Sequence, residues 1–201
     1  MKFAIPFVTA SLALGFATPA MAALKVGDTA PNFTTEAALG GKTHSFTLAT
    51  ALKKGPVVLY FFPAAFTSGC TAEAHAFAEA AADFEKQGAT LIGLTAGNAE
   101  RIKEFSSVEC RDKFPVGLAT PATISGYDVA LPQKAGWTNR TSYVIGTNGK
   151  IAYVLSEMKP EGHITGTLAA VKALKFGARQ VEEALPLRRA AEQAGAIFDP
   201  R

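Results

Sequence analysis

The stretch VVLYFFPAAFTSGCTAEAHAFAEAAADFE, from Val57 to Glu85, decides the fold of this chain. Its first six residues are apolar and rich in β-branched and aromatic types, which predicts a buried strand over 57–62. The Ala-rich segment that follows has Phe77 and Phe84 at helical spacing, which predicts an amphipathic helix. A buried strand joined to a helix by one short loop indicates an α/β domain.

The loop between this strand and this helix ends at Cys70, which we expect to be reactive. Thr67, Ser68 and Gly69 are typical of a helix N-terminus and put Cys70 in the first turn. Unpaired N–H groups and the helix dipole favour negative charge there, and therefore the nucleophilic thiolate. Pro63 fixes the backbone where the strand ends. A small core residue is the alternative for a lone cysteine in an apolar helix.

The segments around this unit predict a mixed sheet. ATLIGLT at 89–95 reads as a second buried strand, parallel to the first through a right-handed crossover. Alternating runs on either side of Gly40-Gly41 predict one hairpin, and those around Asn148-Gly149 predict another. A helix over 163–175, closed by Gly177, should cover the sheet.

The spacing of Pro63, three residues, Thr67, two residues and Cys70 resembles the active-site signature of peroxiredoxins, the cysteine-dependent peroxidases. The resemblance runs from about Val26 to Phe176 and is strongest to the Q-type, or bacterioferritin-comigratory-protein-like, branch. It implies a thioredoxin-like α/β fold, with a central mixed β-sheet flanked by helices.

Two positions depart from that branch. Ser68 stands where the branch usually has proline, and His75 stands five residues after Cys70, where many members carry a second cysteine. After the second strand, AERIKEF at 99–105 predicts another helix, and the remaining cysteine, Cys110, falls at its end. This site is similar to that of the partner cysteine in other Q-type members. The resemblance therefore implies that Cys110 is the resolving thiol and forms an intramolecular disulfide with Cys70. A permanent structural bridge is the alternative in an exported protein with two cysteines.

The function that the resemblance implies is reduction of hydrogen peroxide and organic hydroperoxides through a sulfenic acid on Cys70, the peroxidatic residue. Thr67 and Arg140 would hold the two substrate oxygens, helped by the N–H groups of Gly69 and Cys70, while Pro63 shields the sulfur. Arg140 matches the arginine that peroxiredoxins place beside this sulfur, although a strand-edge arginine by itself is usually a surface residue. No metal or organic cofactor is expected.

Three other functions are compatible with an α/β domain of this kind. An exported thioredoxin-like thiol–disulfide oxidoreductase normally needs C-x-x-C, and residues 67–73 contain one cysteine. A glutathione-peroxidase-like enzyme has similar chemistry but different residues around its active site. A non-catalytic binding or holdase domain on the same fold would not require Pro63, Thr67, Cys70 and Arg140 together.

The N-terminus predicts export. Residues 1–22 contain Lys2, an apolar run too short to span a bilayer, and Ala20-Met21-Ala22, which together indicate a cleavable secretory signal peptide and a periplasmic protein. An uncleaved membrane anchor is the alternative. We expect one peroxiredoxin domain over 23–177 and a C-terminal extension of unknown role over 178–201.

The charge of the chain disfavours two classes of partner, while the resemblance implies small-molecule and thiol partners. It has 20 Lys and Arg against 17 Asp and Glu, a formal net charge of +3, and its basic residues are scattered. This pattern favours neither nucleic-acid binding nor stable membrane association after signal cleavage. The expected partners are a peroxide and a reductant, either a thioredoxin-like protein or a small thiol.

Overall fold

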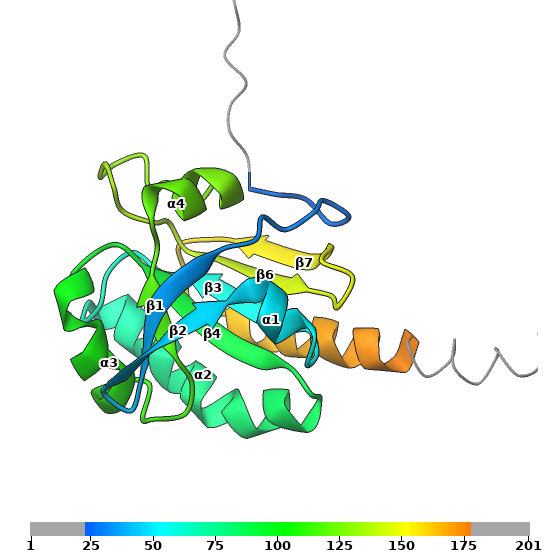
Figure 1. Ribbon diagram of the computed structural model, residues 1–201. Coiled ribbons are helices and arrows are strands. Elements are labelled where there is room, and N and C mark those ends of the chain that lie inside the picture. The colour runs from blue at the N-terminus through cyan, green and yellow to red at the C-terminus, as the bar shows by residue number, and fades with distance from the viewer. Residues whose placement is uncertain (1–22, 178–201) are drawn as a thin grey trace, which may run out of the picture.

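The computed structural model describes residues 23–177, which fold around one seven-stranded mixed sheet (Figure 1). The predicted signal peptide at 1–22 and the C-terminal extension at 178–201 lie outside the described residues. The strand order is β2-β1-β5-β4-β3-β6-β7. The strands are β1 (Thr34–Leu39), β2 (Lys42–Thr47), β3 (Val57–Phe61), β4 (Thr90–Thr95), β5 (Val116–Leu118), β6 (Thr141–Ile145) and β7 (Ile151–Ser156).

Strand β3 lies near the middle of the sheet because it is apolar on both faces. All five of its residues are buried. It pairs in parallel with β4, as predicted, and antiparallel with β6 on its other side. Leu59 and Phe61 join the buried cluster on one face, and Val58 and Tyr60 join the cluster on the other. This alternation lets one strand support a helical layer on each side.

The helices form those two layers. On one face lie α2 (Ser68–Lys86), α3 (Ile102–Val108) with the short 3-10 turn η1 (Ala99–Arg101) before it, and a C-terminal helix described over 163–177 (Figure 1). The other face is covered by α1 (Leu48–Leu52) and α4 (Pro121–Tyr127). The C-terminal helix extends past its predicted end at 175. Within 23–177, no helix is both long and apolar enough to cross a membrane.

Both predicted hairpins are present. Gly40 and Gly41, between β1 and β2, have φ angles of 56° and 73°. Two consecutive residues with positive φ suit the tight turn whose twist matches that of a hairpin, and glycine adopts them without steric cost. Gly149, with φ of 74°, turns the β6–β7 hairpin, which begins directly after Arg140. The predicted α/β class with a mixed sheet is therefore confirmed.

Candidate active site

Cys70 lies in the first turn of α2, where the loop from β3 meets the helix. Its side chain is buried, with 2% of the residue exposed. Thr67 is the N-cap residue and has extended backbone angles, yet its hydroxyl does not cap the helix. The Thr67 Oγ1 donates instead to the Ala64 carbonyl, at 3.1 Å. This bond leaves the lone pairs of the Thr67 hydroxyl free to accept a hydrogen bond from a substrate.

Hydrogen bonds from neighbouring segments fix the loop that precedes Cys70. Thr138 Oγ1 donates to the Phe62 carbonyl at 2.6 Å, and Asn98 Nδ2 donates to the Ala65 carbonyl at 2.8 Å. Phe66 has a φ of 63°, a left-handed conformation that is costly for an aromatic residue. Such strain persists only where the surroundings hold it, and it is common at functional sites.

Pro63 and Gly69 occupy the two ends of this loop. Pro63 is buried, and its carbonyl accepts a hydrogen bond from Thr95 Oγ1 at 3.2 Å. Gly69 lies against Arg140, since a Cβ added at Gly69 would be 3.3 Å from Arg140 Nη2. The missing side chain therefore leaves room for the guanidinium beside the first turn of α2.

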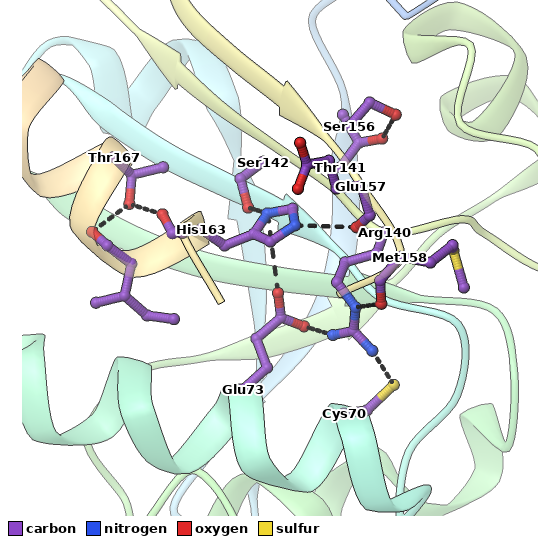
Figure 2. Close-up of polar contacts among 12 residues, drawn as sticks. Cys70, Glu73, Arg140, Thr141, Ser142, Ser156, Glu157, Met158, His163 and Thr167 are labelled. Carbon is purple, nitrogen blue, oxygen red and sulfur yellow. Dashed lines mark hydrogen bonds and ion pairs between the residues drawn. The ribbon is translucent and has the colours of Figure 1, made fainter. Parts of the chain in front are cut away.

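Arg140 brings a buried positive charge to the sulfur (Figure 2). It is 4% exposed, and its Nη2 lies 3.5 Å from Cys70 Sγ. Its Nε donates to the Met158 carbonyl at 2.9 Å, and its Nη1 donates to Glu73 Oε2. The planar guanidinium is thus fixed from three directions, with one edge turned to the sulfur.

Glu73 is a fully buried carboxyl on the same face of α2 as Cys70, one turn further along. Burial raises its pKa to about 8, although the charge and hydrogen bond of Arg140 oppose that rise. Its second oxygen, Oε1, has no hydrogen-bond partner within 23–177 and lies 4.0 Å from His163 Nδ1. A single cation therefore faces two acidic groups, Glu73 and Cys70.

His163 is fully buried at the start of the C-terminal helix. Its Nδ1 is 2.8 Å from Ser142 Oγ on β6, and its Nε2 is 3.0 Å from the Glu157 carbonyl (Figure 2). Burial lowers the pKa of His163, and the nearby charge of Arg140 also lowers it. The imidazole therefore stays neutral near pH 7.

Cys110 follows the end of α3 and has no exposed surface. Both cysteines are free thiols that belong to the same buried cluster, on the α2 face of the sheet. Burial, together with the charge of Glu109, raises the pKa of the Cys110 thiol. His75, five residues after Cys70, pairs with Glu109 through Nε2 and Oε2 at 2.6 Å. The position that holds a second cysteine in many Q-type members thus contacts the residue next to Cys110.

The residues predicted for the site divide into one compact group and one separate cysteine. Pro63, Thr67, Gly69 and Cys70 share the loop and first turn of α2, and Arg140 reaches the sulfur from the residue before β6. Cys110 makes no bond to this group in the reduced protein.

The sequence did not identify Glu73 or His163 as parts of this site. A signal existed for Glu73, because an acidic residue three positions after Cys70 shares its helical face in an otherwise Ala-rich segment. No comparable signal existed for His163, which lies far along the chain and is brought in by the C-terminal helix.

Three comparisons with known proteins bear on this geometry. The model of the AhpC/TSA family matches residues 26–154. The chloroplastic peroxiredoxin Q of Oryza sativa subsp. japonica is 34% identical over 161 residues, which cover 74% of this chain and 67% of that protein. The crystal structure of the peroxidoxin BcpB from Mycobacterium tuberculosis is 31% identical and aligns with a TM-score of 0.67 over 75% of this chain and 98% of its own.

A more distant structure agrees on the fold. AhpC of Mycobacterium tuberculosis is 19% identical, with a TM-score of 0.66 over 77% of this chain and 94% of its own. Together with BcpB it confirms the thioredoxin-like α/β fold predicted from the sequence.

Proposed function

The chain belongs to the AhpC/TSA family and is a peroxiredoxin, a thiol-dependent peroxidase, and from that premise we propose that Cys70 is its peroxidatic residue. The observation that carries this assignment is the 3.5 Å contact between Arg140 Nη2 and Cys70 Sγ in the first turn of α2. A guanidinium remains charged at any physiological pH, so it stabilises a thiolate beside it.

In the first step, the Cys70 thiolate attacks the terminal oxygen of hydrogen peroxide or an organic hydroperoxide. The S–O bond forms as the O–O bond breaks, and the leaving oxygen takes a proton to become water or an alcohol. Cys70 is oxidised to a sulfenic acid and the peroxide is reduced.

The residues around the sulfur suit this displacement. Arg140 can donate to the oxygen on which negative charge develops, which is the usual role of a fixed cationic donor. The Thr67 hydroxyl can accept a hydrogen bond from the hydroperoxide O–H, because its own hydrogen is donated to the Ala64 carbonyl. The N–H groups of Gly69 and Cys70 lie in the first helical turn, where amides lack intrahelical acceptors. Pro63, which is buried at the start of this loop, would limit access of water to the sulfur.

In the second step, the Cys110 thiol attacks the sulfenic acid, releasing water and forming the Cys70–Cys110 disulfide. An external dithiol then reduces this disulfide. Burial keeps Cys110 in its protonated form while the segment is folded. The second step therefore requires the segment after α3 to open, so that Cys110 ionises and approaches Cys70.

The backbone around Cys110 supports such an opening. Arg111 and Asp112 have φ angles of 51° and 56°, so two consecutive non-glycine residues adopt the left-handed region. Each such residue costs on the order of 1 kcal/mol that the folded packing must offset. Opening the segment releases this strain.

Cysteine substitution with a peroxide assay tests the assignment. The protein beginning at Ala23 should consume hydrogen peroxide with dithiothreitol, and with a thioredoxin if it uses a dithiol protein as reductant. Cys70→Ser should abolish turnover, because a serine hydroxyl is scarcely ionised and forms no sulfenic acid. Cys110→Ser, the matched control, should keep turnover with dithiothreitol. Appreciable turnover by the Cys70→Ser protein would falsify the assignment.

We further propose that the protein works in the periplasm after removal of residues 1–22, with a thioredoxin-like protein or a small thiol as reductant. The support is the sequence pattern of Lys2, an apolar run and Ala20-Met21-Ala22. N-terminal sequencing of the protein from an exporting host should find Ala23 first. An intact Met1 in a soluble cytoplasmic fraction would contradict export.

A further inference from the structure

We propose that His163 is a positioning residue for the peroxidase reaction, because it anchors the backbone, the first of two supports that aim the Arg140 guanidinium at Cys70. One support is the backbone at Glu157 and Met158, and the other is the Glu73 carboxyl. The inference rests on the proposed roles of Cys70 and Arg140.

The backbone support is a pair of consecutive carbonyls. The Glu157 carbonyl lies 3.0 Å from His163 Nε2, and the next carbonyl, that of Met158, accepts from Arg140 Nε at 2.9 Å. A carbonyl oxygen only accepts, so Nε2 must carry the hydrogen of the neutral imidazole. His163 thereby holds the short segment after β7 whose next carbonyl orients the guanidinium.

This tautomer determines what the other ring nitrogen can do. With the hydrogen on Nε2, Nδ1 is an acceptor, and it receives the hydroxyl hydrogen of Ser142 at 2.8 Å. The same Nδ1 lies 4.0 Å from Glu73 Oε1, the buried oxygen that has no hydrogen-bond partner among residues 23–177. Nδ1 has a single acceptor lone pair, which Ser142 occupies, so the two groups face each other in Figure 2 without a hydrogen bond between them.

The carboxyl support depends on the protonation state of Glu73. Burial raises the pKa of Glu73 to about 8, so its neutral form is populated near pH 7. With the proton on Oε1 beside His163, Oε2 is left to accept from Arg140 Nη1, as observed. The positive charge of Arg140 is then not neutralised by Glu73 and remains available to the Cys70 thiolate and the peroxide.

The groups that face His163 come from three segments: α2, the start of β6, and the loop after β7 that holds both Glu157 and Lys159. These groups are Glu73 of α2, Arg140 and Ser142 at the start of β6, Glu157 with its side-chain charge, and the Lys159 backbone. Of these groups, only Arg140 also contacts the sulfur. Arg140 is therefore the direct route by which His163 would affect peroxide reduction.

Three variants separate this role from a structural one. His163→Leu removes both ring nitrogens, and His163→Gln keeps a donor within reach of the Glu157 carbonyl. Thr167→Val is the matched control, because the buried Thr167 hydroxyl donates to the His163 carbonyl at 2.6 Å in the same helical turn but touches neither support. Stopped-flow kinetics should measure oxidation by hydrogen peroxide and reduction of the disulfide separately for each protein.

We expect His163→Leu to lower kcat/KM for peroxide by roughly tenfold to a hundredfold, the scale of a misplaced catalytic group. The rate of disulfide reduction should stay unchanged, His163→Gln should recover part of the loss, and Thr167→Val should keep wild-type kcat/KM. In an Arg140→Ala background, His163→Leu should add little further loss, since residues acting through one group are not additive.

Three results would overturn the proposal. They are wild-type kcat/KM in the His163→Leu protein, an equal fall in both half-reactions, and an undiminished effect of His163→Leu in the Arg140→Ala background. If His163→Leu does not fold, His163→Gln carries the test: it should lower kcat/KM for peroxide alone, and wild-type behaviour contradicts the proposal. The Cys70→Ser assay separates this failure from failure of the proposed function, because it does not involve His163.

Discussion

At the scale of single residues, Arg140 shows how surroundings decide what a side chain does. An arginine at a strand edge is usually solvated, yet Arg140 is 4% exposed. A buried cation is tolerated where acceptors replace water, and three of its nitrogens contact Cys70, Glu73 and the Met158 carbonyl. The same three contacts fix its position relative to the sulfur.

Substitution of Arg140 should therefore affect the first half-reaction strongly. We expect Arg140→Ala to lower kcat/KM for hydrogen peroxide by about a hundredfold or more, as for removal of one donor to a developing negative charge. The kcat/KM of Arg140→Lys should lie between those of the wild type and Arg140→Ala, because lysine keeps a charge but lacks the planar guanidinium. Stopped-flow oxidation of the reduced proteins measures both. Equal rates for Arg140→Ala and the wild type would show that the guanidinium does not contact the reacting oxygens.

The buried carboxyl of Glu73 should make stability depend on pH. Its pKa is about 8 in the folded protein against 4.5 for the unperturbed group, so the folded state binds more protons between these values and stability falls as pH rises. From about pH 6.5 to pH 8 we expect a loss of about 2 kcal/mol. His163 opposes this trend slightly near pH 6.5, because burial lowers its pKa in the folded protein and the unfolded state therefore binds more protons there.

Glu73→Gln should remove most of that loss, since a glutamine amide does not titrate. Urea unfolding at the two pH values, for the wild type and the variant, measures it. An equally steep loss in the Glu73→Gln protein would mean that another group is responsible.

At the scale of elements, the loops that follow two neighbouring parallel strands brace each other. The loop after β3 carries Ala64 and Ala65, and the loop after β4 carries Gly97. Ala64 and Gly97 form a parallel bridge, and the Ala65 N–H donates to the Gly97 carbonyl at 3.1 Å. Because the same loop leads to Cys70, the position of the sulfur depends on a close approach that glycine permits.

Gly97→Ala should therefore displace the active-site loop, although Gly97 itself is not part of the active site. An added Cβ would lie 2.3 Å from the Pro63 carbonyl and 2.7 Å from the Ala64 Cβ, so the active-site loop would have to move. We expect a loss of about 1–3 kcal/mol in stability and a lower rate of oxidation by peroxide. Gly126→Ala, in α4, is the control, because its Cβ would make ordinary contacts with Pro31 at 3.4 Å. Thermal unfolding and stopped-flow oxidation should be measured on both variants. Equal stability and equal oxidation rates for Gly97→Ala and Gly126→Ala would contradict the prediction.

At the scale of the whole molecule, the two cysteines share one buried layer without a bond between them. Two side-chain contacts join the segment around Cys110 to α2: a hydrogen bond between His75 and Glu109 at 2.6 Å, and an ion pair between Glu79 and Arg111 at 3.3 Å. These contacts hold Cys110 in place in the reduced protein. Formation of a disulfide with Cys70 therefore requires these contacts to break and the layer to open locally.

One equivalent of hydrogen peroxide should convert the reduced protein into a monomer with a Cys70–Cys110 disulfide. Cys110→Ser should instead trap a sulfenic acid on Cys70. Mass spectrometry of the peroxide-treated proteins identifies the products, and hydrogen exchange should show lost protection around Cys110 on oxidation. A dimer linked only through Cys70, or a non-reducible monomer with Cys110 free, would rule out the resolving role.

The sequence alone determined the parts of this protein that depend on local patterns. An apolar strand, N-cap residues and an amphipathic helix predicted the unit that carries Cys70, and the Gly40-Gly41 and Asn148-Gly149 turns predicted the two hairpins. These features follow from side-chain periodicity and backbone preferences over a few residues. The peroxiredoxin family was likewise predicted from the spacing of Pro63, Thr67 and Cys70, and the family comparisons confirm it.

The resemblance implied that Arg140 lies beside the sulfur, but only the tertiary structure decided which groups hold Arg140 there. Arg140, Glu73 and His163 come from three elements far apart in the chain, and their contacts arise because β6 and the C-terminal helix pack beside α2. The burial that raises the pKa of Glu73 and lowers that of His163 comes from the same packing. A side chain's neighbours and its exposure to water depend on how whole layers pack, and no local pattern of residues specifies them.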